Sequence, residues 1–194
     1  MIVDLLAEDA AHEEFLRPLI GRLAREIDVR VEVRVRAARG GHPRVMQELD
    51  LYQRAIAQGV ADRPDLLVVA IDSNCVPYTR ARRGIERGIH REFLGITVIA
   101  CPDPHVERWY LSDPPSFGQV VGKLPRGGKR KCGRDFYKRR LAEAVAAAGH
   151  PVLLGGIEFA EELVASMDLY RAGKTEKSLK RFVDELRAGL TARR

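Results

Sequence analysis

Acidic and amide side chains follow the apolar runs of this chain, and they are the residues whose spacing first indicates chemistry. Glu8 and Asp9 follow the apolar run near the N-terminus, Asp72 and Asn74 follow a second run, and Asp103, Glu107 and Asp113 follow a third. If these runs are parallel strands, their carboxyl ends meet at one edge of a sheet. Hard divalent ions prefer such oxygen ligands. The spacing therefore predicts a Mg²⁺ (or Mn²⁺) site that could hold a phosphodiester and activate a water molecule.

Each of these residues also has an ordinary structural role. Glu8 and Asp9 fit the negative charges that helix N-termini favour, Asp72 fits a turn after a strand, and Glu107 fits the start of a short helix. One acid after one strand would carry little weight. Acids after three of the expected parallel strands favour a site over three unrelated structural roles.

Histidine and cysteine side chains fall near the same predicted edge. Cys101 and His105 are four residues apart, a spacing seen in zinc sites, and His12 and Cys75 are also close to strand ends. No CxxC pair accompanies them, and free cysteine is usually buried. A zinc-bound structural module therefore remains a minor alternative.

The elements that must position these residues alternate between strand and helix. Continuous apolar runs predict buried parallel strands, whereas strict alternation at 29–36 predicts a strand with one wet face near a sheet edge. Helical spacing of apolar residues separates the strands. The expected strands are 2–6, 29–36, 66–71 and 96–100, and the expected helices between them are 15–27, 43–57 and 79–93. This order predicts an α/β fold with a doubly wound, mainly parallel sheet of four to five strands.

Prolines and glycines divide the rest of the chain into shorter pieces. Short helices are expected after Cys101, and longer ones at 135–148, 158–167 and 175–190, with a last short strand at 152–154. We expect an α/β core at 1–121 and, at 122–194, a basic loop and C-terminal helices that pack on this core as one domain overall.

The segment 122–140 is strongly basic. It contains nine cations against one acid, Asp135, in a chain whose formal net charge is +6. Such a cluster is typical of a nucleic-acid contact, although a solvated loop is the ordinary alternative. The residues we expect to bind phosphates are Lys129, Arg130, Lys131 and Lys138.

Several classes of protein are disfavoured by what the sequence lacks. Three cysteines argue against a disulfide framework, and the N-terminus has no basic region before an apolar stretch, as a signal peptide would. No apolar run approaches the length of a membrane span. A cytoplasmic protein with no membrane partner is expected. Serine hydrolysis and independent ATP hydrolysis are disfavoured because GxSxG and Walker A motifs are missing.

Four stretches resemble TOPRIM domains, and in particular the TOPRIM-like family catalogued as domain of unknown function 4276, related to the overcoming-lysogenization-defect nucleases. The opening LLAEDAAHEEFLRPLIGRL resembles the first strand, glutamate and helix of TOPRIM, and LLVVAIDSN resembles its Asp-x-Asp motif. CPDPHVERWYLSDP and GGIEFAEELVASMDL resemble later parts of the family. The combination touches most of the chain.

The resemblance implies a metal-dependent nuclease, or a nuclease subunit, that hydrolyses phosphodiester bonds of DNA or RNA. It implies Glu8 as acid, base or ligand, Asp72 as a metal ligand, and Asn74 where the family has a second aspartate. We expect Glu107 to join Glu8 and Asp72 in catalysis, and Asp113 to support the metal. Since Asn74 lacks a charge, weaker Mg²⁺ binding is expected. Relatives of this kind are often encoded beside an ATPase and are associated with phage defence, so an ATPase partner is implied; a homodimer is also compatible.

Two other readings of the same residues stay open. The chain could be a non-catalytic subunit with a degenerate TOPRIM site that binds nucleic acid or an ATPase. Response-regulator receivers also carry acids after strands one and three, but they are much shorter and need a lysine after strand five, where this chain has Gly155 and Gly156. The receiver reading is therefore the weaker one.

Overall fold

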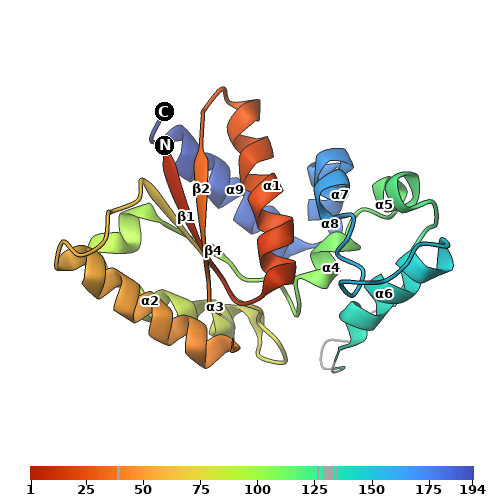
Figure 1. Ribbon diagram of the computed structural model, residues 1–194, viewed down its shortest axis with the longest axis horizontal. Coiled ribbons are helices and arrows are strands. Elements are labelled where there is room, and N and C mark those ends of the chain that lie inside the picture. The colour runs from red at the N-terminus through yellow and green to blue at the C-terminus, as the bar shows by residue number, and fades with distance from the viewer. Residues whose placement is uncertain (39, 126, 129–132, 134) are drawn as a thin grey trace.

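A four-stranded, all-parallel sheet forms the centre of the protein (Figure 1). The computed structural model describes residues 1–38, 40–125, 127–128, 133 and 135–194. The strands are β1 (Ile2–Ala7), β2 (Glu32–Ala37), β3 (Leu66–Ala70) and β4 (Thr97–Ala100), in the order β2-β1-β3-β4. The predicted doubly wound α/β fold is confirmed.

Helices cover both faces of this sheet. α1 (Ala10–Glu26) and α9 (Lys177–Thr191) pack on one face, and α2 (His42–Ala57) and α3 (Tyr78–Arg87) pack on the other (Figure 1). A 3₁₀ helix, η1 (Arg91–Ile96), leads from α3 into β4. The protein thus has three layers, with the sheet between two cores.

Side-chain alternation along the strands divides the apolar residues between the two cores. Leu66, Val68 and Ala70 of β3 belong to the core under α1 and α9, whereas Leu67 and Val69 belong to the core under α2 and α3. Both sets are buried because successive strand residues point to opposite faces. This is why the run at 66–71 is continuously apolar.

The edge strand β2 alternates because only one of its faces is apolar. Val33 and Val35 pack against the α1 core. On the other face, Arg34 donates from Nε to Oδ1 of the fully buried Asp4 at 2.6 Å, and Tyr52 of α2 donates its hydroxyl to the same carboxylate. The predicted edge position is confirmed, and Asp4 balances the arginine-bearing face.

Smaller helices extend the α1 layer sideways. They are α4 (Glu107–Tyr110), α5 (Pro114–Val121), α6 (Phe136–Ala147), α7 (Ala160–Ser166) and α8 (Leu169–Thr175), and they lie beside α1 in Figure 1. Their apolar side chains join the core under α1 and α9. The chain then returns to the sheet, where α9 packs on β4. Gly189 of α9 permits this approach, since a Cβ there would lie 3.1 Å from Leu66 Cδ1.

Four expectations about elements need correction. Residues 152–154 form no strand, and their side chains are 36, 80 and 62 % exposed. The helix expected at 79–93 ends at Arg87, and η1 follows it. The segment 175–190 is preceded by a separate helix, α8. β4 is an edge strand in the order β2-β1-β3-β4, and it is apolar because helices cover both of its faces.

Within the described residues, no helix has the length and apolar character needed to cross a bilayer.

Candidate metal centre

The carboxyl ends of β1 and β3 form the point where the chain reverses its direction across the sheet. From β1 the chain passes through α1 to β2 on one side, and then through α2 to β3 on the other side. Ala7 and Ala70 are paired at the ends of these neighbouring strands. Ligands of open parallel sheets bind at such a switch point. Glu8 directly follows β1, and Asp72 lies two residues after the end of β3, so the two acids meet there.

Glu8 and Asp72 are joined by the backbone. The Glu8 amide continues the ladder by donating to the Ala70 carbonyl at 3.1 Å, and the Asp72 amide donates to Glu8 Oε2 at 3.0 Å. Burial, together with the neighbouring Asp72 charge, raises the pKa of Glu8, although the Asp72 amide opposes this rise. The structure thus brings together the two acids that the sequence places after different strands.

His12 links these acids to the first turn of α1. Asp9 is the N-cap of α1, where its carboxylate accepts from the His12 amide at 3.1 Å and lies 2.8 Å from His12 Nδ1. The imidazole is fully buried. Burial lowers the pKa of His12, but the carboxylates of Asp72 and Asp9 outweigh it and raise this pKa well above 6.5. For Asp9 the burial effect has the opposite sign and raises the pKa. The hydrogen bond and charge of His12 outweigh it, and the pKa of Asp9 falls to about 2.

Asp72 lies between two imidazoles. His12 Nε2 is 3.1 Å from Asp72 Oδ1, and His105 Nδ1 is 3.0 Å from Asp72 Oδ2. Burial raises the pKa of Asp72, yet these imidazoles lower it below its usual value. The imidazole of His12 and the buried carboxylate of Asp72 thus lie at ion-pair distance.

The same atoms fit a bound cation. His12 Nε2 and Asp72 Oδ1 are buried and lie at ion-pair distance, but neither has a partner in hydrogen-bond geometry. One ligand atom from each of Glu8, His12 and Asp72 lies within 4.8 Å of the others. Metal–ligand bonds of about 2.1 Å in octahedral geometry separate ligand atoms by about 3.0–4.2 Å. A small closing movement would therefore bring the three side chains onto one ion.

Glu107 and Lys138 border this cluster. Both line a small cavity of about 140 Å³ together with Asp9 and with Leu154 and Gly155 of the loop before α7. Glu107 is 8 % exposed, and burial followed by repulsion from Asp72 raises its pKa. A buried carboxyl group and a lysine thus share one cavity with Asp9, the residue that contacts His12.

Two predicted metal ligands, Asn74 and Asp113, lie outside the cluster of Glu8, His12 and Asp72. Asn74 is exposed, in the left-handed region with φ of 52°, and its side-chain Nδ2 donates to the Asp72 carbonyl at 3.4 Å. Asp113 precedes α5, where it accepts from Arg171 and from the Asp168 amide at 2.8 Å. Burial raises the pKa of Asp113, but Arg171 lowers it below its usual value. The structure therefore joins Asp113 to the α8 region through an ion pair and does not include it in the cluster.

The predicted phosphate-binding residues and the alternative zinc ligands are placed only in part. Lys129, Arg130 and Lys131 lie outside the described residues, so only Lys138 of that set is placed. Cys101 is buried in the core under α2 and α3, away from the Asp72 carboxylate on which His105 lies. In the part of the chain that is described, the one group able to share an ion contains no cysteine.

His12 is the candidate ligand that the pattern of acids did not include. It falls four residues after Glu8, at the start of a helix, and a single turn separates these positions. That spacing is visible in the sequence, but the contact with Asp72, sixty residues later in the chain, depends on the pairing of β1 with β3.

In comparisons with known proteins, no family model matches the chain, and no curated protein or solved structure matches it significantly.

Proposed function

We propose that this protein is a metal-dependent nuclease, or the nuclease subunit of a complex, with its reaction centre at Glu8, His12 and Asp72. The observation that carries the proposal is the pair of buried atoms His12 Nε2 and Asp72 Oδ1, which lie 3.1 Å apart at the switch point of the sheet and have no partner in hydrogen-bond geometry. Glu8 completes the ligand set. The resemblance to TOPRIM nucleases is consistent with this position of the acids.

The side chains at the site suggest which residue has which role in the reaction. Glu8, His12 and Asp72 would hold the ion, which when bound supplies charge to the phosphodiester and lowers the pKa of a water molecule. Glu107, whose pKa burial raises, suits a proton donor to the leaving oxygen. Lys138 shares the cavity with Glu107 and suits a contact with a substrate phosphate.

The ligand set also bears on which ion is bound. Carboxylates suit Mg²⁺ and Mn²⁺, whereas imidazole suits transition metals. Since His12 supplies nitrogen, we expect Mn²⁺ to support activity at lower concentration than Mg²⁺. Asn74 is exposed and adds no charge to the cluster, which also favours the ion that binds nitrogen.

The proposal is tested by cleavage of labelled single- and double-stranded DNA and RNA with Mn²⁺, Mg²⁺ or EDTA. Glu8→Gln and Asp72→Asn should abolish metal-dependent cutting while the far-UV circular dichroism spectrum stays unchanged. Glu14→Gln, an exposed carboxylate on α1, is the matched control and should cut normally. Normal cutting by Asp72→Asn would refute the assignment.

One observation favours a second candidate, a non-catalytic subunit that binds nucleic acid or a separately encoded ATPase. Both oxygens of Asp72 already face imidazoles, so the acids are compensated without any ion. Such a protein would bind nucleic acid but show no thermal stabilisation by Mn²⁺, whereas the nuclease should be stabilised by mass action. This melting experiment separates the candidates even when a partner is required for cutting.

A further inference from the structure

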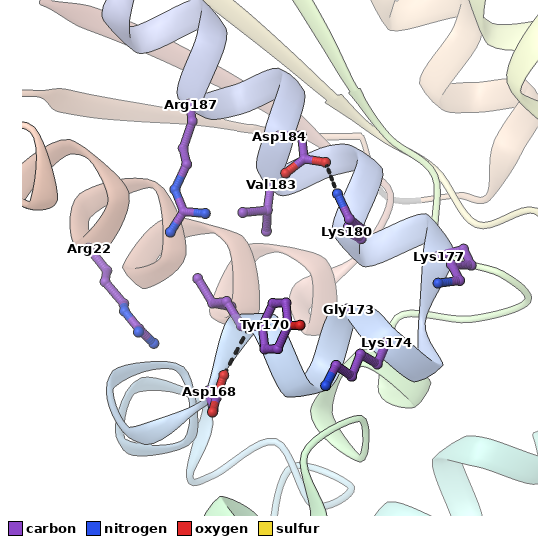
Figure 2. A pocket seen from close by; sticks show the side chains of 11 residues that line it. Arg22, Asp168, Tyr170, Gly173, Lys174, Lys177, Lys180, Val183, Asp184 and Arg187 are labelled. Atoms are coloured by element: carbon purple, nitrogen blue, oxygen red, sulfur yellow. Dashed lines mark hydrogen bonds and ion pairs between the residues drawn. The ribbon is translucent and has the colours of Figure 1, made fainter.

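A second, separate cavity lies between α1, α8 and α9 (Figure 2). Its volume is about 430 Å³, within the range of small-ligand sites. Five cations line it, namely Arg22, Lys174, Lys177, Lys180 and Arg187, and the acids on its wall are Asp168 and Asp184. The cavity is therefore a positively charged groove, and it lies apart from the metal centre.

Three of these cations are occupied by the protein itself. Lys180 pairs with Asp184 at 2.5 Å, and Arg187 pairs with Glu26 at 2.8 Å. Arg22 donates to two main-chain carbonyls at the end of α7, each at 2.7 Å. These contacts hold the walls of the groove in place. The net positive charge of the groove therefore comes from the two remaining cations, Lys174 and Lys177.

Lys174 and Lys177 are exposed and form no ion pair with any carboxylate of the described chain. Both extend from the ends of adjacent helices, since Lys174 lies in the last turn of α8 and Lys177 begins α9. The positive end of the α9 dipole adds to their charge. Two unpaired ammonium groups at one end of a cavity suit a phosphate.

Tyr170 supplies a flat apolar surface beside them. Its ring is 74 % exposed, whereas every other aromatic side chain of the chain is buried or half-buried. Lys174 Nζ lies 4.4 Å from the ring centroid, and Figure 2 shows the ring standing in the groove. Asp168 holds this turn by accepting from the Tyr170 amide at 3.0 Å. Exposed aromatic rings beside cations are the surfaces on which nucleobases stack.

We propose that this groove binds a phosphorylated nucleoside, with the base on Tyr170 and the phosphate between Lys174 and Lys177. Free nucleotides and the nucleotides of a nucleic-acid strand share this chemistry. The groove does not depend on the metal centre: Arg22 lies ten residues after His12 on α1, roughly 15 Å along the helix axis. The inference therefore stands apart from the proposed nuclease activity.

The test is isothermal titration calorimetry of the full chain in EDTA with ATP, AMP, inorganic pyrophosphate and a short oligothymidylate. The stacking variants are Tyr170→Leu and the conservative Tyr170→Phe, and the charge variant is the double change Lys174→Gln with Lys177→Gln. The matched control removes two cations from helices on the opposite face, Arg54→Gln with Arg83→Gln.

We expect wild-type protein to bind a nucleotide, and Tyr170→Leu and the double lysine variant to bind it at least roughly tenfold more weakly. Tyr170→Phe and the arginine control should keep wild-type affinity. Binding of ATP or AMP identifies a free nucleotide as the ligand, and binding of the oligonucleotide alone identifies a strand; both support the proposal. It is overturned if no probe binds, if pyrophosphate binds as tightly as ATP, or if Tyr170→Leu has no effect.

Discussion

Gly156 fixes how the loop before α7 lies on α6, and its replacement by alanine gives a sharp test of the packing. Its φ is +98°, and a Cβ at this position would lie 2.8 Å from the main-chain carbon of Leu141 and 2.9 Å from the nitrogen of Ala142. Both neighbours are backbone atoms inside a helix and cannot rotate away. The loop or α6 would have to shift.

The expected cost has two parts. A positive φ costs an alanine about 1–2 kcal/mol, and forcing packed backbone apart costs about 1–3 kcal/mol more. Gly149→Ala is the matched control, because its φ is +88° and no atom lies within 4 Å of the added Cβ. We expect Gly156→Ala to lower the free energy of unfolding by about 2–5 kcal/mol and Gly149→Ala by about 1–2 kcal/mol.

Urea unfolding, followed by circular dichroism, measures both losses. The difference between the two variants isolates the crowding against α6, since the backbone strain is common to both. If Gly149→Ala and Gly156→Ala lose the same stability, the close approach of Gly156 to Leu141 is not a feature of the folded protein, and the reasoning fails.

Three other perturbations are predicted. Burial, and then Asp4, raises the pKa of Tyr52 from 10.0 to about 12, so its contribution to stability is present below pH 10 and is lost as the pH rises to 12. The urea midpoint of Tyr52→Phe should not fall over this alkaline range. An equal fall in the variant and the wild type would contradict the prediction. Mn²⁺ at a hundredfold excess over its dissociation constant should raise the melting temperature by about 5–10 °C, and Asp72→Asn should remove the rise; an equal rise in the variant would exclude the cluster. Asp113→Asn should cost about 1–2 kcal/mol at neutral pH, because it loses Arg171. Since the Asp113 pKa is lowered from 3.8, the wild-type advantage should vanish as the pH falls below that value; an advantage that persists in acid-unfolding curves would contradict the pairing.

The buried strands β1 and β3 and the edge strand β2 are recognisable from features that are local in the sequence. The runs ending before Glu8 and Asp72 are apolar on both faces, and a buried parallel strand requires that pattern. Because the carboxyl ends of parallel strands share one edge, the meeting of these two acids could also be expected. The alternation at Val33 and Val35 likewise predicts an edge strand, because only one face of that strand packs against a core.

What the sequence could not supply are pairings between distant segments. Asp113 follows β4 and resembles a ligand in the sequence, but its partner Arg171 is 58 residues away and depends on how α8 packs against α5. The apolar triplet 152–154 has strand propensity, yet the amides of Leu153 and Leu154 both donate to Glu158 Oε1 at 2.6 Å, which holds a turn. Propensity alone does not create a neighbouring strand to pair with.

The two cores that flank the sheet differ in what stabilises them. The core under α1 and α9 also receives α4 to α8, whereas the core under α2 and α3 is closed by those two helices and η1. Layers with fewer apolar partners open at lower free energy in native-state hydrogen exchange. We expect amides of α2 and α3 to exchange before those of α1 and β1. The cluster of Glu8, His12 and Asp72 lies at the boundary between these layers, since a Cβ on Gly41, just before α2, would come within 4.0 Å of Glu8 Oε1. Opening of the α2 layer would therefore expose Glu8 to solvent while His12, on α1, keeps its place, without global unfolding.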